Sequence, residues 1–146
     1  MTTPDESLIE FLYEDTNFVL DEQNELIRWI NQITDAHQFN LVSLTYIFCS
    51  DAYLQQINQE FLNKDYFTDI ITFDNSDVAD SIEGDVFVSV DRVRENAQDR
   101  SLPFRDELHR VIIHGVLHLL GHTDKDLLSQ TAMRHKEDSC LTMRHF

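Results

Sequence analysis

Three residues with metal-binding side chains lie close together in the C-terminal half of the sequence. His114 and His118 are four residues apart in a stretch that predicts a helix, so both side chains project from one face, one turn apart. Gly121 follows and permits the left-handed turn that ends a helix. After such a turn the chain can fold back and offer Asp124 as a third ligand. Two imidazoles and a carboxylate with an open fourth position are typical of a catalytic zinc site.

Other interpretations of this segment stay open. A histidine pair at this spacing on an apolar helix is often partly buried polar packing, and His122 competes with Asp124 for the third position. We favour Asp124, because His122 directly follows Gly121 and leaves little chain for a reversal. The remaining histidines have no such partners and are expected to be core or surface residues: His37, His109, His135 and His145.

The residue after His114 argues against one reaction. In metalloproteases with the spacing H-x-x-x-H-x-x-G-x-x-H/D, a glutamate follows the first histidine and acts as general base. This chain has Gly115, which carries no proton acceptor. Peptide hydrolysis by that mechanism is therefore disfavoured, and an attacking water must be activated by the metal or by another group. Asp69 and Asp85 are candidates for that group, or simply polar residues at the ends of elements.

The elements that position these residues follow from apolar spacing and from the few glycines and prolines. Pro103 can open the helix that carries the histidines, and Gly121 can close it. Further helices are expected at 21–37, 51–63, 91–100 and 125–143. Strands are expected at 8–13, 41–49, 69–73 and 84–90, with an acidic loop at 74–83. The pattern predicts an α+β fold, α/β-like in its alternation, with one mixed sheet of about four strands against about five helices.

Length and composition describe a single globular domain over residues 1–146. Hydrophobic residues make up 42% and charged residues 26%, as in folded soluble proteins. No apolar run approaches the roughly 18 residues of a membrane span, and the segment Met1–Glu6 lacks the features of a secretion signal. We therefore expect a cytoplasmic protein in which Cys49 and Cys140 are reduced.

The charge is strongly acidic and unevenly distributed. The net charge of −16 lies entirely in residues 1–90, which hold 18 acidic and 2 basic residues, whereas residues 91–146 hold nine of each. This composition excludes a protein that coats nucleic acid by charge alone. Five arginines between positions 92 and 110 could form a local basic patch or belong to a helix face of mixed charge.

Several stretches resemble one known family. Residues 114–124, HGVLHLLGHTD, are similar to the hallmark H-G-x-L-H-L-x-G-Y-D-H of the YbeY-type endoribonucleases, also called rRNA maturation factors. Residues 63–73, NKDYFTDIITF, resemble the family's G-K-D-x-P-T-D-V-L-S-F, and residues 84–86 resemble its G-D-I/V strand start. The similarity covers most of the chain, which is identified as a member of this family.

The resemblance implies a function and its requirements. It implies a zinc-dependent, single-strand-specific endoribonuclease that acts in ribosomal RNA maturation, including 16S rRNA 3′-end processing, and in ribosome quality control. One Zn²⁺ is expected, held by His114, His118 and Asp124. The implied partners are single-stranded ribosomal RNA and ribosomal or ribosome-assembly proteins, with no role for DNA or a membrane.

The sequence departs from the family pattern at two positions. The family's third histidine aligns with Asp124, so an anion replaces a neutral ligand and a zinc-bound water should be less acidic. The family's arginine in Y-R-G-K-D aligns with Leu62, and Lys64 and Arg110 are candidates for its role. The alternatives are a metalloprotease-like or other metal-dependent hydrolase, a non-haem iron oxygenase, and a ribosome-associated binding factor with a structural metal.

Overall fold

A computed structural model describes residues 8–146, so the expectation for the segment Met1–Glu6 lies outside the described residues. The elements follow one another as β1 (Ile9–Glu14), α2 (Gln23–Ala36), β2 (Asn40–Cys49), α3 (Asp51–Leu62), β3 (Ile70–Asp74), β4 (Ser81–Ser89), α4 (Val90–Asp99), α5 (Phe104–Leu119) and α6 (Leu127–Thr142). None of the helices in this part of the chain has the length and apolar character needed to cross a membrane.

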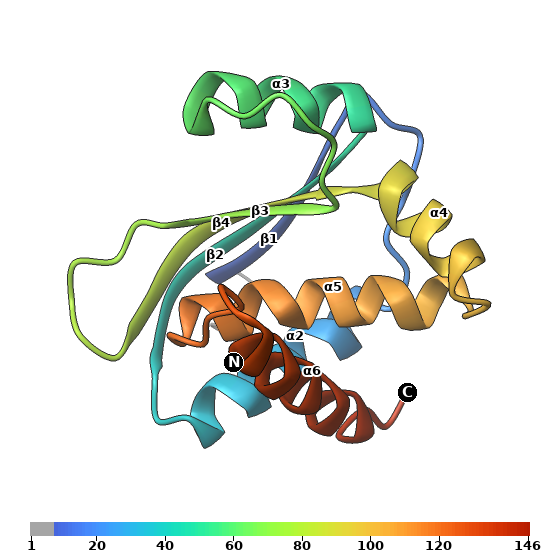
Figure 1. The fold of residues 1–146 in the computed structure, drawn as a ribbon. Coiled ribbons are helices and arrows are strands. Elements are labelled where there is room, and N and C mark those ends of the chain that lie inside the picture. The colour runs from blue at the N-terminus through green and yellow to red at the C-terminus, as the bar shows by residue number, and fades with distance from the viewer. Residues whose placement is uncertain (1–7) are drawn as a thin grey trace.

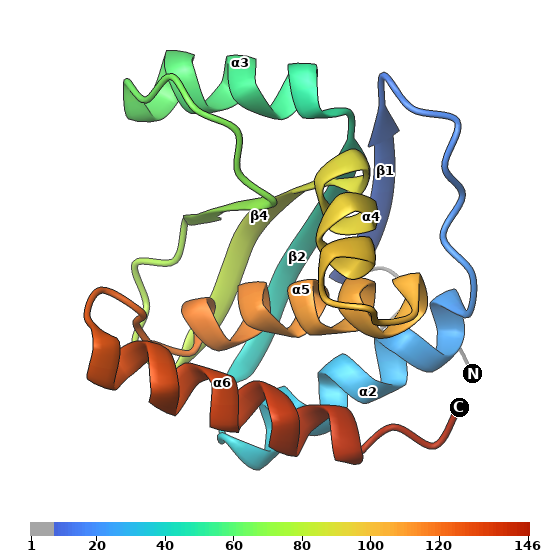
Figure 2. The same ribbon diagram turned by 45° about the vertical axis from the view of Figure 1, so that its right-hand side comes forward.

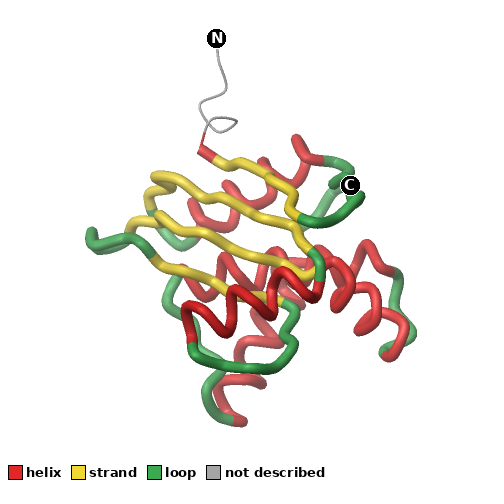
Figure 3. The backbone as a smooth tube through the Cα atoms, turned by 90° about the horizontal axis from the view of Figure 1, so that it is seen from above, coloured by secondary structure: helices red, strands yellow, loops and turns green. Residues whose placement is uncertain are grey.

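The four strands form one mixed sheet in the order β1-β2-β4-β3. β1, β2 and β4 run parallel, and β3 pairs antiparallel with β4. Figure 3 shows the four strands side by side in one sheet. Parallel neighbours need long crossover connections, and helices supply them here. The predicted fold class, a mixed sheet of four strands with five helices, is therefore confirmed.

The helices lie on both faces of the sheet (Figures 1 and 2). α2, α5 and α6 lie on one face, and α3 lies on the other. Two buried hydrogen bonds fix the helical layer. The Tyr46 hydroxyl in β2 donates to the Ile112 carbonyl in α5 at 2.8 Å, and the Trp29 indole in α2 donates to the Cys140 carbonyl in α6 at 2.9 Å. Each helix of this layer is thereby tied to a neighbour deep in the core.

Helix α5 approaches the sheet closely at Gly115. A Cβ atom at this position would lie 3.0 Å from Cγ1 of Val86 in β4 and 3.3 Å from Cδ1 of Ile70 in β3. These contacts are tighter than ordinary packing, so a larger residue would push the helix away from the sheet. The glycine that removes a protease-type base from the sequence pattern thus has a packing role.

The predicted acidic loop is wrong in its second half. β4 begins at Ser81, three residues before the expected start, and only residues 75–80 connect it to β3. The reason is Ile82, which is fully buried and pairs with Leu41 of β2. Its polar neighbours alternate with it in the strand pattern, but they made the segment look like a loop.

Candidate metal centre

The end of α5 is a tight reversal that brings Asp124 back over the helix. Gly121 has φ +101°, its amide donates to the His118 carbonyl, and the His122 amide donates to the Leu117 carbonyl, both at 3.0 Å. This pair of bonds is the Schellman arrangement that closes helices at a glycine. The Gln130 side chain in α6 then donates to the Asp124 carbonyl at 3.1 Å and holds the returning chain.

His114, His118 and Asp124 converge on one point. Nε2 of His114 lies 3.4 Å from one Asp124 carboxylate oxygen, and Nε2 of His118 lies 3.6 Å from the other. One ligand atom from each residue lies within 4.8 Å of the other two. Two ligands about 2.1 Å from a tetrahedral zinc ion are separated by about 3.4 Å. The donor set and its spacing therefore fit a divalent metal ion such as zinc.

Glu137 in α6 completes the surroundings of His114. Its carboxylate lies 2.6 Å from Nδ1 of His114, so the ring donates there and turns Nε2 toward Asp124. Burial lowers the pKa of His114, but the Glu137 hydrogen bond and the nearby carboxylates outweigh it and raise that pKa above the ordinary value. A carboxylate behind a ligating histidine fixes the ring and makes it a better ligand.

Arg110, which the sequence suggested as a replacement for the family's arginine, is bound by residues of α6. Its guanidinium donates to Glu137 at 2.9 Å and to Asp138 at 2.7 Å. Only 18% of its side chain is exposed. Its position favours a role in fixing the Glu137 carboxylate, one turn of α5 before His114.

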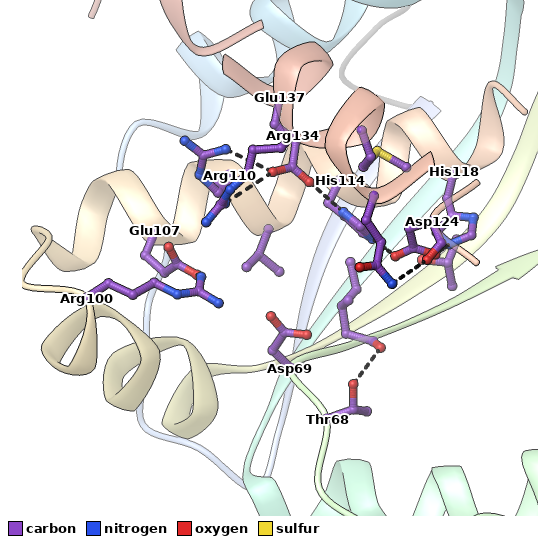
Figure 4. A pocket seen from close by; sticks show the side chains of 15 residues that line it. Thr68, Asp69, Arg100, Glu107, Arg110, His114, His118, Asp124, Arg134 and Glu137 are labelled. Carbon is purple, nitrogen blue, oxygen red and sulfur yellow. Dashed lines mark hydrogen bonds and ion pairs between the residues drawn. The ribbon is translucent and has the colours of Figure 1, made fainter. Parts of the chain in front are cut away.

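These residues line a pocket of about 500 Å³ (Figure 4). His118 and Asp124 stand at one end, and Arg100 with Glu107 stands at the other. The side chains of His118 and Asp124 are 38% and 39% exposed, so the candidate ligands can be reached from solvent. A closed structural site would hide its ligands, and this arrangement is open in the way that catalytic sites are.

Asp69 lies across the pocket from Glu137, just before β3 (Figure 4). Its carboxylate makes no ion pair with any residue between 8 and 146. Burial raises its pKa, although the charge of His114 acts in the opposite direction. Perturbed carboxyl groups in clefts are candidates for proton transfer.

Other sequence candidates lie elsewhere. The His122 ring packs against His37, with 5.6 Å between ring centroids, and His122 does not belong to the His114–His118–Asp124 group. Lys64 is exposed above the Tyr66 ring and does not line the pocket. Asp85 accepts a hydrogen bond from Asn75 at 3.1 Å and also lies outside the pocket lining.

The alternative of a basic patch between positions 92 and 110 is not what the structure shows. Arg92 pairs with Asp51, and Arg105 pairs with Glu22, each at 2.8 Å. The other three are also engaged: Arg94 above the Phe104 ring, Arg100 with Glu107, and Arg110 with α6. The acidic N-terminal part thus supplies partners that the charge pattern alone did not reveal.

Sequence reasoning missed Glu137 and Arg134, and it considered Arg100 only as part of a possible basic patch; all three line the pocket. Glu137 is 23 residues from His114 along the chain, and no local spacing connects the two. Only the packing of α6 against α5 brings them together. The structure shows Met133 and Glu137 both buried, one turn apart on α6, but burial could not be read from the sequence.

Comparison with known proteins identifies the family. The sequence model described as Endoribonuclease YbeY matches residues 10–144. The chain belongs to the YbeY endoribonuclease family. This YbeY match spans every residue that lines the pocket, from Thr68 to Glu137.

Relatives and a solved structure agree with the assignment. A protein named Endoribonuclease YbeY from Cytophaga hutchinsonii is 50% identical over 141 residues, covering 97% of this chain and 99% of the relative. Another of the same name from Flavobacterium psychrophilum is 44% identical, covering 94% and 97%. The solution structure of TM1509 from Thermotoga maritima superposes with a TM-score of 0.64 at 27% identity, covering 91% of this chain and 86% of that one.

Proposed function

We propose that this chain is a zinc-dependent endoribonuclease that cleaves single-stranded RNA in ribosomal RNA maturation, including the 3′ end of 16S rRNA. One observation carries the proposal. In a chain that matches the YbeY family over residues 10–144, two histidines and an aspartate converge at the open end of a pocket. The relatives from Cytophaga hutchinsonii and Flavobacterium psychrophilum are both named endoribonucleases.

His114, His118 and Asp124 are the proposed ligands of one zinc ion. Their distances support this assignment, as does the Glu137 carboxylate that occupies Nδ1 of His114 and leaves Nε2 for a metal. When bound, a divalent metal supplies Lewis acidity that polarises an oxygen of the scissile phosphodiester.

The chain's own groups must accept the proton of the nucleophile, whether that is a water or the substrate 2′-hydroxyl. Gly115 offers no base, so the acceptor must come from another element. We assign this task to the Asp69 carboxylate, because it lines the same pocket and has no ion pair among the described residues. Its raised pKa, caused by burial, moves it toward the range in which a carboxylate can accept and release a proton near neutral pH.

The test uses the purified full chain and synthetic RNA. We expect it to contain zinc and to cleave a labelled single strand but not the matching duplex or a DNA strand. An RNA end with a 2′,3′-cyclic phosphate would identify the substrate 2′-hydroxyl as nucleophile, and a linear phosphate end would indicate water. Cleavage of a protein substrate without cleavage of RNA would overturn the proposal in favour of a protease-like hydrolase. Iron with oxygen-dependent turnover would overturn it in favour of an oxygenase.

The acidic surplus bears on how RNA reaches the pocket. A net charge of −16 repels polyanions, so binding to free RNA should be weak. The contacts that do form pair phosphates with arginines or the metal, so binding should weaken further as salt rises. A ribosomal or ribosome-assembly protein that presents the RNA fits this charge. Equal affinity for free RNA at about 50 and about 200 mM salt would contradict this part of the proposal.

A further inference from the structure

Three arginines line the pocket, and they differ in how many hydrogen bonds and ion pairs they make within the protein. The guanidinium of Arg110 is held by two carboxylates, as described above. Arg134, on the exposed face of α6, lies 3.9 Å from Glu137, which is too far for a hydrogen bond. It makes no other ion pair or hydrogen bond with residues 8–146, and 53% of its side chain is exposed. Arg134 is therefore an uncommitted cation in the pocket wall.

Arg100 is anchored at one atom only. Its Nη1 donates to Glu107 at 2.6 Å, and the Glu107 side chain is 1% exposed. A guanidinium has five N–H donors, and those on Nε and Nη2 of Arg100 have no partner in the described part of the chain. The buried carboxylate thus fixes the arginine from behind, while 45% of the arginine side chain remains exposed.

These arginines stand apart from the candidate ligands (Figure 4). In that view Arg100 and Arg134 lie toward one side of the pocket, and His118 and Asp124 lie toward the other. Four carboxylates and three guanidinium groups line the whole pocket, which gives a formal charge of −1 with neutral histidines. A divalent cation at the ligands would change that formal charge to +1, which favours the binding of an anion in the pocket.

We propose that Arg134 and Arg100 form a phosphate-binding subsite that holds an RNA backbone phosphate next to the scissile one. This inference rests on the proposed function. The free fork of a guanidinium matches the oxygens of a phosphate, which can accept two parallel hydrogen bonds. A pocket of about 500 Å³ has room for a nucleotide segment that extends from the metal to this subsite. The strand would then be held at two points, the metal and the subsite, which strengthens substrate binding.

The first test removes the uncommitted cation. Arg134→Gln should raise KM for a single-stranded RNA about tenfold, the factor for one hydrogen bond between charged groups, and leave kcat within about twofold. It should also reduce the slope of log affinity against log salt by about 0.7, the value for one phosphate contact on a single strand. Zinc content should stay unchanged. Arg28→Gln is the matched control, because Arg28 is exposed in α2 and lies outside this pocket.

The second test removes the phosphate charge. In an RNA with one cleavage site, single uncharged methylphosphonate linkages are placed in turn at the positions flanking that site. The wild-type chain should lose about tenfold in kcat/KM at one flanking position. Arg134→Gln should lose no more than about twofold there, because the contact is already absent.

The two tests separate the subsite from the function on which it rests. If the wild-type chain cleaves RNA but Arg134→Gln matches Arg28→Gln in KM and salt slope, the subsite is wrong and the function stands. Equal losses at every flanking linkage for both chains would also refute the subsite. A wild-type chain that contains metal and cleaves no RNA would refute the function, and the subsite with it.

Discussion

The two halves of helix α5 carry histidines in opposite environments. His109, in the first half, is buried beside the rings of Trp29 and Phe146. Its Nδ1 accepts a hydrogen bond from Arg144 at 2.8 Å. Burial, together with the charges of Arg105 and Arg144, lowers its pKa to about 4. His109 is therefore neutral, accepts a hydrogen bond and packs in the core.

His114, in the second half, meets carboxylates on both ring nitrogens. Nδ1 lies 2.6 Å from Glu137 and Nε2 lies 3.4 Å from Asp124. Its pKa is raised, whereas that of His109 is lowered. Burial lowers the pKa of both histidines, and only at His114 do neighbouring carboxylates outweigh burial and favour a ligating role. For His114 the strongest raising partner, Glu137, lies 23 residues away on α6. For His109, burial and Arg105 on the same helix lower the pKa more than the more distant Arg144 does.

The largest expected difference between the halves is in metal binding. His114→Ala should lower zinc affinity by more than about 100-fold and abolish RNA cleavage, because removing a ligand costs more than removing an outer partner. His109→Gln should retain zinc and cleavage. Equilibrium dialysis and cleavage assays on both variants measure the contrast. Equal zinc affinity in the two variants would contradict the assignment of His114 as a ligand and His109 as a core residue.

A smaller effect is expected from the carboxylate behind His114. Glu137→Gln keeps a side chain of the same shape and removes its charge, so zinc affinity should fall about tenfold. Asp138→Asn is the matched control, because Asp138 also accepts from Arg110 but does not contact His114. Competitive chelator titration gives both affinities. A loss of the same size in Asp138→Asn would mean that Arg110, not the bond to His114, transmits the effect.

His109, in the first half of α5, should make the stability of the fold depend on pH in the acidic range. In the unfolded chain His109 is protonated below a pH of about 6.5, whereas in the folded chain it is protonated only below a pH of about 4. Stability should therefore fall as pH drops through this window, by a total of about 3 kcal/mol from this residue. Urea unfolding of wild type and His109→Gln between pH 7 and 4 isolates this contribution. Parallel pH profiles for the two chains would show that His109 is not kept neutral by the fold.

The features of α5 that were predicted from the sequence are those that depend on nearby residues. The bounds of α5 were predicted from Pro103 and Gly121, which act locally through a fixed φ and a left-handed turn. The convergence of His114, His118 and Asp124 followed from the same local geometry. These features follow from helix periodicity and turn geometry within a short stretch of chain.

Other features of the pocket could not be predicted because they depend on tertiary packing. Glu137 and Arg134 reach the pocket only because α6 packs on α5, and Arg100 does so from the end of α4. The arginines between 92 and 110 suggested a patch, but acidic residues from distant elements neutralise Arg92 and Arg105. Charge patterns in sequence do not show which opposite charges will meet.

The central claim is that α5 and the turn after it gather His114, His118 and Asp124 around one metal ion. Metal stoichiometry of the purified chain tests it most directly, with Asp124→Ala compared against His122→Ala. The account predicts one zinc per wild-type chain, retention in His122→Ala, and loss in Asp124→Ala. Retention of zinc in Asp124→Ala together with its loss in His122→Ala would contradict the account.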